Sequence, residues 1–160
     1  MVFLFFSINI QTFSSSTEEG RCVMRKFAPQ YVVMIQAAVT NHHQLFDIDL
    51  ITKLLFAVAK AGNLEPAADR PMVNQLPCLD DSGDMSYTFL LPLMTSHLKM
   101  TCRVIDNHRP HVGVDTWPED DVVLLFFHSC QPVDKDAIRQ AVVQLFHPND
   151  TIAEEHVFFK

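Results

Sequence analysis

The chain has 160 residues, of which 48% are hydrophobic, and its formal net charge is −7. This length and composition predict one domain with a sizeable core. The longest basic run is Arg25-Lys26, which argues against nucleic acid as a partner because phosphate affinity rests on clustered Lys and Arg. Four cysteines without a Cys-x-x-Cys spacing favour reduced thiols in the cytoplasm over a disulfide scaffold.

The first ten residues are mostly apolar, but this run is far shorter than the roughly 20 residues that span a bilayer. We therefore expect no membrane contact. The Ser/Thr tract at 14–17 favours a flexible leader over residues 1–26. Residues 27–160 are expected to form the single domain.

Residues 31–40 are rich in β-branched and apolar side chains and predict a strand. A helix is predicted next, because Asp47 or Asp49 can cap its start and Gly62-Asn63 supplies its end. Its apolar stripe consists of Ile51, Leu54, Leu55 and Val58. Packing of this stripe against a sheet needs no cofactor.

Three prolines within residues 65–84 predict short strands and exposed loops. Further strands are predicted over residues 87–93, 98–105, 112–116 and 121–128. The unbroken apolar run 122–127 predicts a strand that is buried on both faces, or one that packs against the core on one face and a partner on the other.

A second helix is predicted after Asp134, with His147 in its last turn and Pro148 beyond it. Its buried stripe consists of Ile138, Ala141, Val142 and Leu145. Residues 155–159 predict a terminal strand. This order of elements predicts an α+β fold, an antiparallel sheet with two helices packed on one face.

One segment carries more information than the rest: residues 111–119, His-Val-Gly-Val-Asp-Thr-Trp-Pro-Glu, followed eleven residues later by Cys130. It resembles the bacterial-type S-adenosylmethionine decarboxylases, which carry Glu-Ser-His, then His-Thr-Trp-Pro-Glu, and a cysteine at the same separation. The resemblance implies their fold, S-adenosylmethionine as substrate and a role in polyamine (spermidine) biosynthesis. It also implies a homodimer, or a heterodimer with a homologue.

The resemblance implies a pyruvoyl cofactor as well, which that family makes from its serine. Laid on this chain without gaps, the serine falls on Pro110, the glutamate on Arg109 and the second histidine on Asp115. Pyruvoyl formation begins when a side-chain hydroxyl or thiol attacks the preceding carbonyl. Pro110 has neither group, so self-cleavage at this position is chemically impossible.

A second placement uses Ser96-His97-Leu98, which matches the Ser-His-Leu of the family. It makes Ser96 the pyruvoyl precursor, and so both a processing and a catalytic residue. It also leaves fourteen extra residues before the Trp-Pro-Glu motif, which would loop out as a hairpin over residues 99–110.

The resemblance assigns the other site residues. Cys130 matches the acid that protonates the product, and His111 matches the histidine after the serine. Asp115 stands at the processing base, a role that requires a pKa raised by burial. Trp117 and Glu119 are expected to bind substrate. From the residues alone, Cys130 also fits a small buried hydrophobe and Asp115 a polar strand end.

Three hypotheses follow for function. One is an active pyruvoyl-dependent carboxy-lyase that uses Ser96 and Cys130. Another is a non-catalytic pseudoenzyme that pairs with or regulates an active homologue. The third is a metal-binding domain with His108, His111, Asp115 and Cys130 as ligands, although zinc ligands usually come as tighter pairs. We assign no metal site from the sequence.

Overall fold

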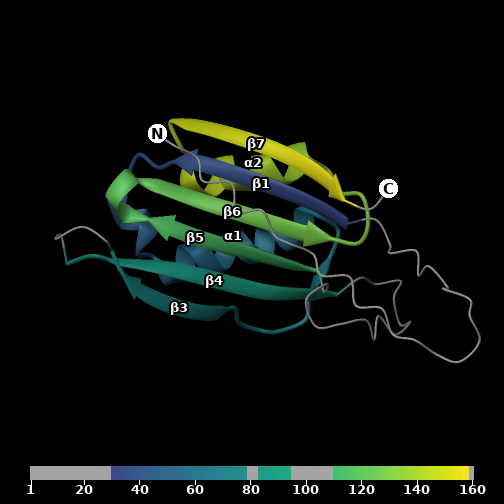
Figure 1. The fold of residues 1–160 in the computed structure, drawn as a ribbon, viewed down its shortest axis with the longest axis horizontal. Coiled ribbons are helices and arrows are strands. Elements are labelled where there is room, and N and C mark those ends of the chain that lie inside the picture. The colour runs from purple at the N-terminus through teal and green to yellow at the C-terminus, as the bar shows by residue number, and fades with distance from the viewer. Residues whose placement is uncertain (1–29, 79–82, 95–109, 159–160) are drawn as a thin grey trace, which may run out of the picture.

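The computed structural model describes residues 30–78, 83–94 and 110–158. The leader, the strand predicted over 98–105, Ser96 and His108 lie outside these ranges. Figure 1 shows how the described elements are arranged. In chain order they are β1 (Gln30–Ala38), η1 (His42–Leu45), α1 (Ile48–Ala61), β2 (Glu65–Pro66), β3 (Met72–Pro77), β4 (Met85–Met94), β5 (His111–Trp117), η2 (Pro118–Asp120), β6 (Val122–Ser129), α2 (Lys135–Phe146) and β7 (Asp150–Phe158).

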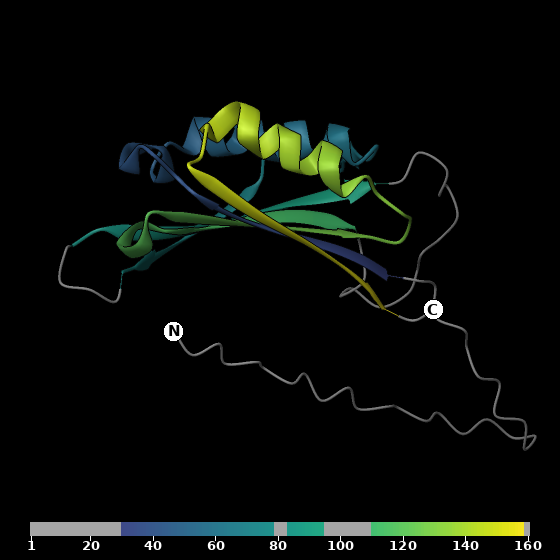
Figure 2. The same ribbon diagram turned by 90° about the horizontal axis from the view of Figure 1, so that it is seen from above.

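The strands form one antiparallel sheet in the order β2-β4-β5-β6-β1-β7, with β3 paired beside β2 along β4. Both α-helices lie on the same side of this sheet (Figure 2). The predicted α+β fold is therefore confirmed. No helix in the described residues is long and apolar enough to cross a bilayer.

The first helix forms as its sequence predicts. The Asp47 side chain accepts a hydrogen bond from the Leu50 N–H at 2.8 Å and caps the start of α1. Gly62 caps its end, and its N–H donates to the Val58 carbonyl at 2.9 Å. The predicted stripe is fully buried against the sheet, and its members are Ile51, Leu54, Leu55 and Val58.

The second helix begins where expected, because the Asp134 side chain accepts from the N–H groups of Asp136 and Ala137, each at 3.0 Å. Its end differs slightly from the prediction. His147 is not in the last turn but is the C-cap, with a left-handed φ of 46°. The chain reverses there so that β7 can run back along β1.

That final strand is longer than predicted, since β7 covers Asp150–Phe158 and not only residues 155–159. It pairs with β1 along the whole length of β1. Packing explains why β7 is longer. Thr151 and Ala153 alternate with exposed residues and face the helix layer, so the less apolar first half of the strand also packs against the rest of the domain.

The run 122–127 alternates between the two faces of the sheet. Val123, Leu125 and Phe127 are at most 1% exposed and belong to the core under the helices. Leu124 and Phe126 point to the other side, which no described helix covers (Figure 2). The structure therefore shows this strand with one face in the core and the other face directed away from it.

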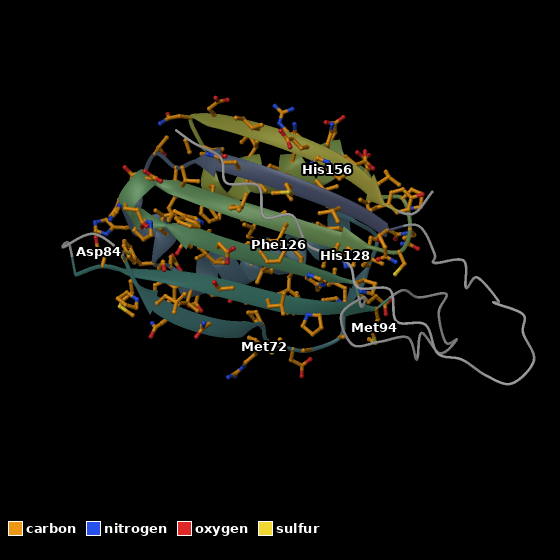
Figure 3. All side chains as sticks on the ribbon, in the orientation of Figure 1. Met72, Asp84, Met94, Phe126, His128 and His156 are labelled. Carbon is orange, nitrogen blue, oxygen red and sulfur yellow. The ribbon has the colours of Figure 1, made fainter. Side chains whose placement is uncertain are left out.

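We call this second side the open face. Strand alternation and register place six of the eight exposed large hydrophobic residues on it. Figure 3 labels Met72 and Met94 among them. These six are Met34, Met72, Leu76, Met94, Trp117 and Ile152. The open face is therefore far more apolar than a solvent-facing surface requires.

An electrostatic link joins three segments at the end of the sheet where β5 turns into β6. His42 Nδ1 lies 2.6 Å from Asp121 Oδ1, and His42 Nε2 lies 3.7 Å from Asp84 Oδ2. The hydrogen bond to Asp121 is the main reason that the pKa of His42 is raised, and Asp84 contributes further. The link therefore strengthens when His42 is protonated.

This predicts a pH-dependent contribution to stability. Because the pKa of His42 is higher in the folded state, its contribution is fully present below the unfolded value of about 6.5 and is lost as pH rises through the folded pKa. The variant Asp121→Asn keeps a residue type that tolerates the left-handed φ of 52°. Urea unfolding should show Asp121→Asn destabilised between about pH 5 and 6.5 and unchanged near pH 9. A difference that grows with pH would contradict the link.

Candidate functional site

Cys130 follows the last residue of β6 and is partly exposed. Its Sγ lies 3.8 Å from Nε2 and 4.0 Å from Oε1 of Gln30, which is only 8% exposed. The Ser129 hydroxyl accepts from the Gln131 N–H at 3.0 Å and shapes the turn that follows. The strand end thus presents a thiol beside a buried amide.

Pro110 lies at the same end of the sheet. Its carbonyl accepts a hydrogen bond from the Leu93 N–H at 2.8 Å, so the residue is held against β4. The next residue, His111, is paired with His128 of β6. Pro110 and Cys130 therefore flank the His111–His128 pair, each within two residues of it.

The rings of His111 and His128 meet on the open face, with centroids 5.1 Å apart. Phe126 meets the His111 ring edge-on at 6.1 Å. Its own ring fills the space over Gly113, where an added Cβ would overlap it. A glycine on β5 and a phenylalanine on β6 thus form a wall along one side of the histidine pair.

Asp115 meets the electrostatic condition for a proton acceptor. Burial raises the pKa of its carboxyl, while a hydrogen bond with Thr88 acts in the opposite direction. Its Oδ1 is buried without a hydrogen-bond partner among the described residues. However, Asp115 is four residues along β5 from His111, a distance of about 13 Å, and the two do not touch.

Trp117 and Glu119 lie at the opposite end of the sheet from Cys130. Trp117 ends β5 on the open face and is 43% exposed, and Glu119 is an exposed residue of η2. Six residues of strand separate Trp117 from His111, which amounts to about 20 Å. Within one chain, therefore, the expected substrate-binding residues and the expected acid do not meet.

The ligand set of the metal hypothesis does not gather either. His108 lies outside the described residues, and His111, Asp115 and Cys130 are spread along the strands. In the described part of the chain, no group of three or more His, Cys, Asp or Glu side chains is arranged to hold a metal ion.

Two residues at the Cys130 end were missed from the sequence, His128 and Gln30. A signal for His128 was present in the sequence. Trp117 and Val122 are the last paired residues before the turn, and six residues back from Trp117 and six residues forward from Val122 are His111 and His128. Gln30 gave none, since its place beside Cys130 follows from the pairing of β1 with β6.

Comparisons with known proteins find similarity among solved structures. No family model and no curated protein matches the chain. The crystal structure of the adenosylmethionine decarboxylase from Aquifex aeolicus VF5 is similar, with 15% identity and a TM-score of 0.48, over 82% of this chain and 91% of that one. At this level of similarity no residue role passes from that protein to this chain.

Proposed function

We propose that this chain is a non-catalytic S-adenosylmethionine decarboxylase-like protein of polyamine biosynthesis. In this proposal it makes no pyruvoyl group at the position where the family motif expects one, and it acts in the cytoplasm as half of a pair of chains. The observation that carries the proposal is Pro110, which precedes His111 at the end of the sheet where Cys130 also lies.

The residues at this position do not fit a pyruvoyl group. Its formation requires a side-chain oxygen or sulfur on the residue that becomes the ketone, and Pro110 has only ring carbons. The proline ring also fixes φ, and the Pro110 carbonyl is engaged with the Leu93 N–H. We therefore derive no reaction step through this group.

The open face offers features suited to S-adenosylmethionine as a ligand. The ligand carries a sulfonium cation, and cations bind over the face of an exposed indole. Trp117 supplies such an indole, with Asp115 two residues earlier on the same face and Glu119 in the adjoining turn. These groups support binding of the ligand without chemistry on it.

A second copy of this chain is the partner that the open face favours. Without the two-residue β2, the other six strands, about 4.8 Å apart and with about eight residues each, give this face an area of roughly 750 Å². That is comparable to the ~800 Å² per partner in a stable complex. If the strands of the two copies run in opposite directions across the interface, the Cys130 end of one chain lies over the Trp117 end of the other. Pairing in this way would unite residues that one chain keeps apart.

Intact-mass analysis of freshly purified protein tests the proposal. We expect one species of full mass, and a melting temperature that rises with S-adenosylmethionine. Two fragments that meet at Ser96, the smaller of them beginning at that residue as the pyruvoyl group, would overturn it. They would establish the second candidate, an active carboxy-lyase with Ser96 as pyruvoyl precursor. The variant Ser96→Ala is the matched control, because it removes any cleavage at that site and leaves Pro110 unchanged.

A further inference from the structure

We propose that His111 and His128 form a binding site for a divalent transition-metal ion such as Zn²⁺. This inference does not depend on the proposed function. The two residues are directly opposite each other on β5 and β6. Opposed residues of an antiparallel pair have Cβ atoms about 4.5–5.5 Å apart, close enough for both imidazoles to reach one ion.

The separation of the ring centroids is compatible with shared coordination. A zinc–nitrogen bond is about 2.1 Å long and an imidazole centroid lies about 1.1 Å behind the ligating nitrogen, so each centroid would lie about 3.2 Å from the ion. At the tetrahedral angle, two such rings have centroids about 5.2 Å apart. The observed separation is 5.1 Å.

The site is partly accessible, although Nδ1 of His128 is buried, and the ring of His111 is held in place. Both histidines are partly exposed, and His128 lies on the open face (Figure 3). The Phe126 ring packs edge-on against His111 and is seated over Gly113. This contact limits the ring positions of His111, which reduces the ordering cost of binding an ion.

The donor atoms indicate the class of metal. Imidazole nitrogen is a good ligand for zinc, copper and nickel, whereas magnesium and calcium require oxygen. The described residues supply two ligands, so water or another molecule would complete the coordination. A site of this kind is open, like a catalytic zinc site, and unlike a closed structural one.

Titration calorimetry with Zn²⁺ on the full chain tests the proposal. We expect one ion per chain in the parent protein. Loss of an outer-shell partner already costs about 10–100-fold in metal affinity, so loss of a ligand in His111→Gln or His128→Gln should cost more than about 100-fold. The control is His156→Gln, which changes a histidine on the same face, separated from His128 by Val32 of β1. Its affinity should be unchanged.

A second measurement needs no variant and so does not depend on their folding. With one equivalent of Cu²⁺, the electron paramagnetic resonance spectrum of the parent should show hyperfine coupling to two imidazole nitrogens. Absence of Zn²⁺ binding in the parent would overturn the proposal. So would equal loss of affinity in His156→Gln, or a copper spectrum without two nitrogen ligands.

Discussion

The variant Met34→Lys is expected to convert a dimer of this chain into monomers. Met34 is 38% exposed and lies on β1 within the open face. Pairing through this face would bury the ammonium group of the new lysine. The partner chain carries no carboxylate introduced to form an ion pair with it. Desolvation of this charge costs several kcal/mol even with a carboxylate of the same chain beside it, so the dissociation constant should rise by more than about 100-fold.

The monomer should tolerate this change. Glu154 of β7 is the register partner of Met34, and an opposite charge directly across a strand pair is favourable. Sedimentation over a concentration series measures the effect. The control is Val73→Lys, which changes a residue of similar exposure, 44%, on the helix side of β3. A parent protein that is monomeric at all concentrations, or equal dissociation of both variants, would contradict pairing through the open face.

The variant Phe127→Ala should lose about 3–5 kcal/mol of unfolding free energy, a large part of the stability of a small domain. Phe127 is fully buried, and its ring lies directly against Gly62 at the end of α1. The backbone of a capped helix end cannot move into the space that the ring leaves. A cavity therefore remains and adds to the lost burial.

The neighbouring variant Phe126→Ala is the matched comparison, because it removes the same side chain from the opposite face. Phe126 is partly exposed, so its truncation should cost much less than that of Phe127. Urea unfolding, made in the Met34→Lys background to avoid pairing, measures both. Equal losses would mean that the two faces of β6 are equally buried within one chain.

The sequence was sufficient to predict both α-helices and the strands β1, β4, β5 and β6 because their signals are local. Asp47 and Asp134 cap helices through hydrogen bonds to N–H groups two or three residues away, and the apolar stripes repeat at helical spacing. The α+β order follows from these signals. The extent of β7 was underestimated because it is set by its pairing with β1, which is more than a hundred residues away in sequence.

The candidate site was predicted only in part, for the same reason. The motif indicated Pro110, His111 and Cys130, and the structure brings these to one end of the sheet. It also included Trp117, which a strand of seven residues carries to the other end. Spacing along a chain fixes how far apart residues lie in an extended strand, but not which side chains face them from neighbouring strands.

The outer border of β7 has a consequence for how copies of the chain can associate. In the described residues β7 is bordered only by β1, so its other edge leaves backbone groups that could recruit a strand from another molecule. Asp150, Glu154 and Glu155 are exposed along it. Two such edges brought together would set carboxylates against carboxylates, which discourages fibre-like growth of the sheet and leaves face-to-face contact as the less repulsive route.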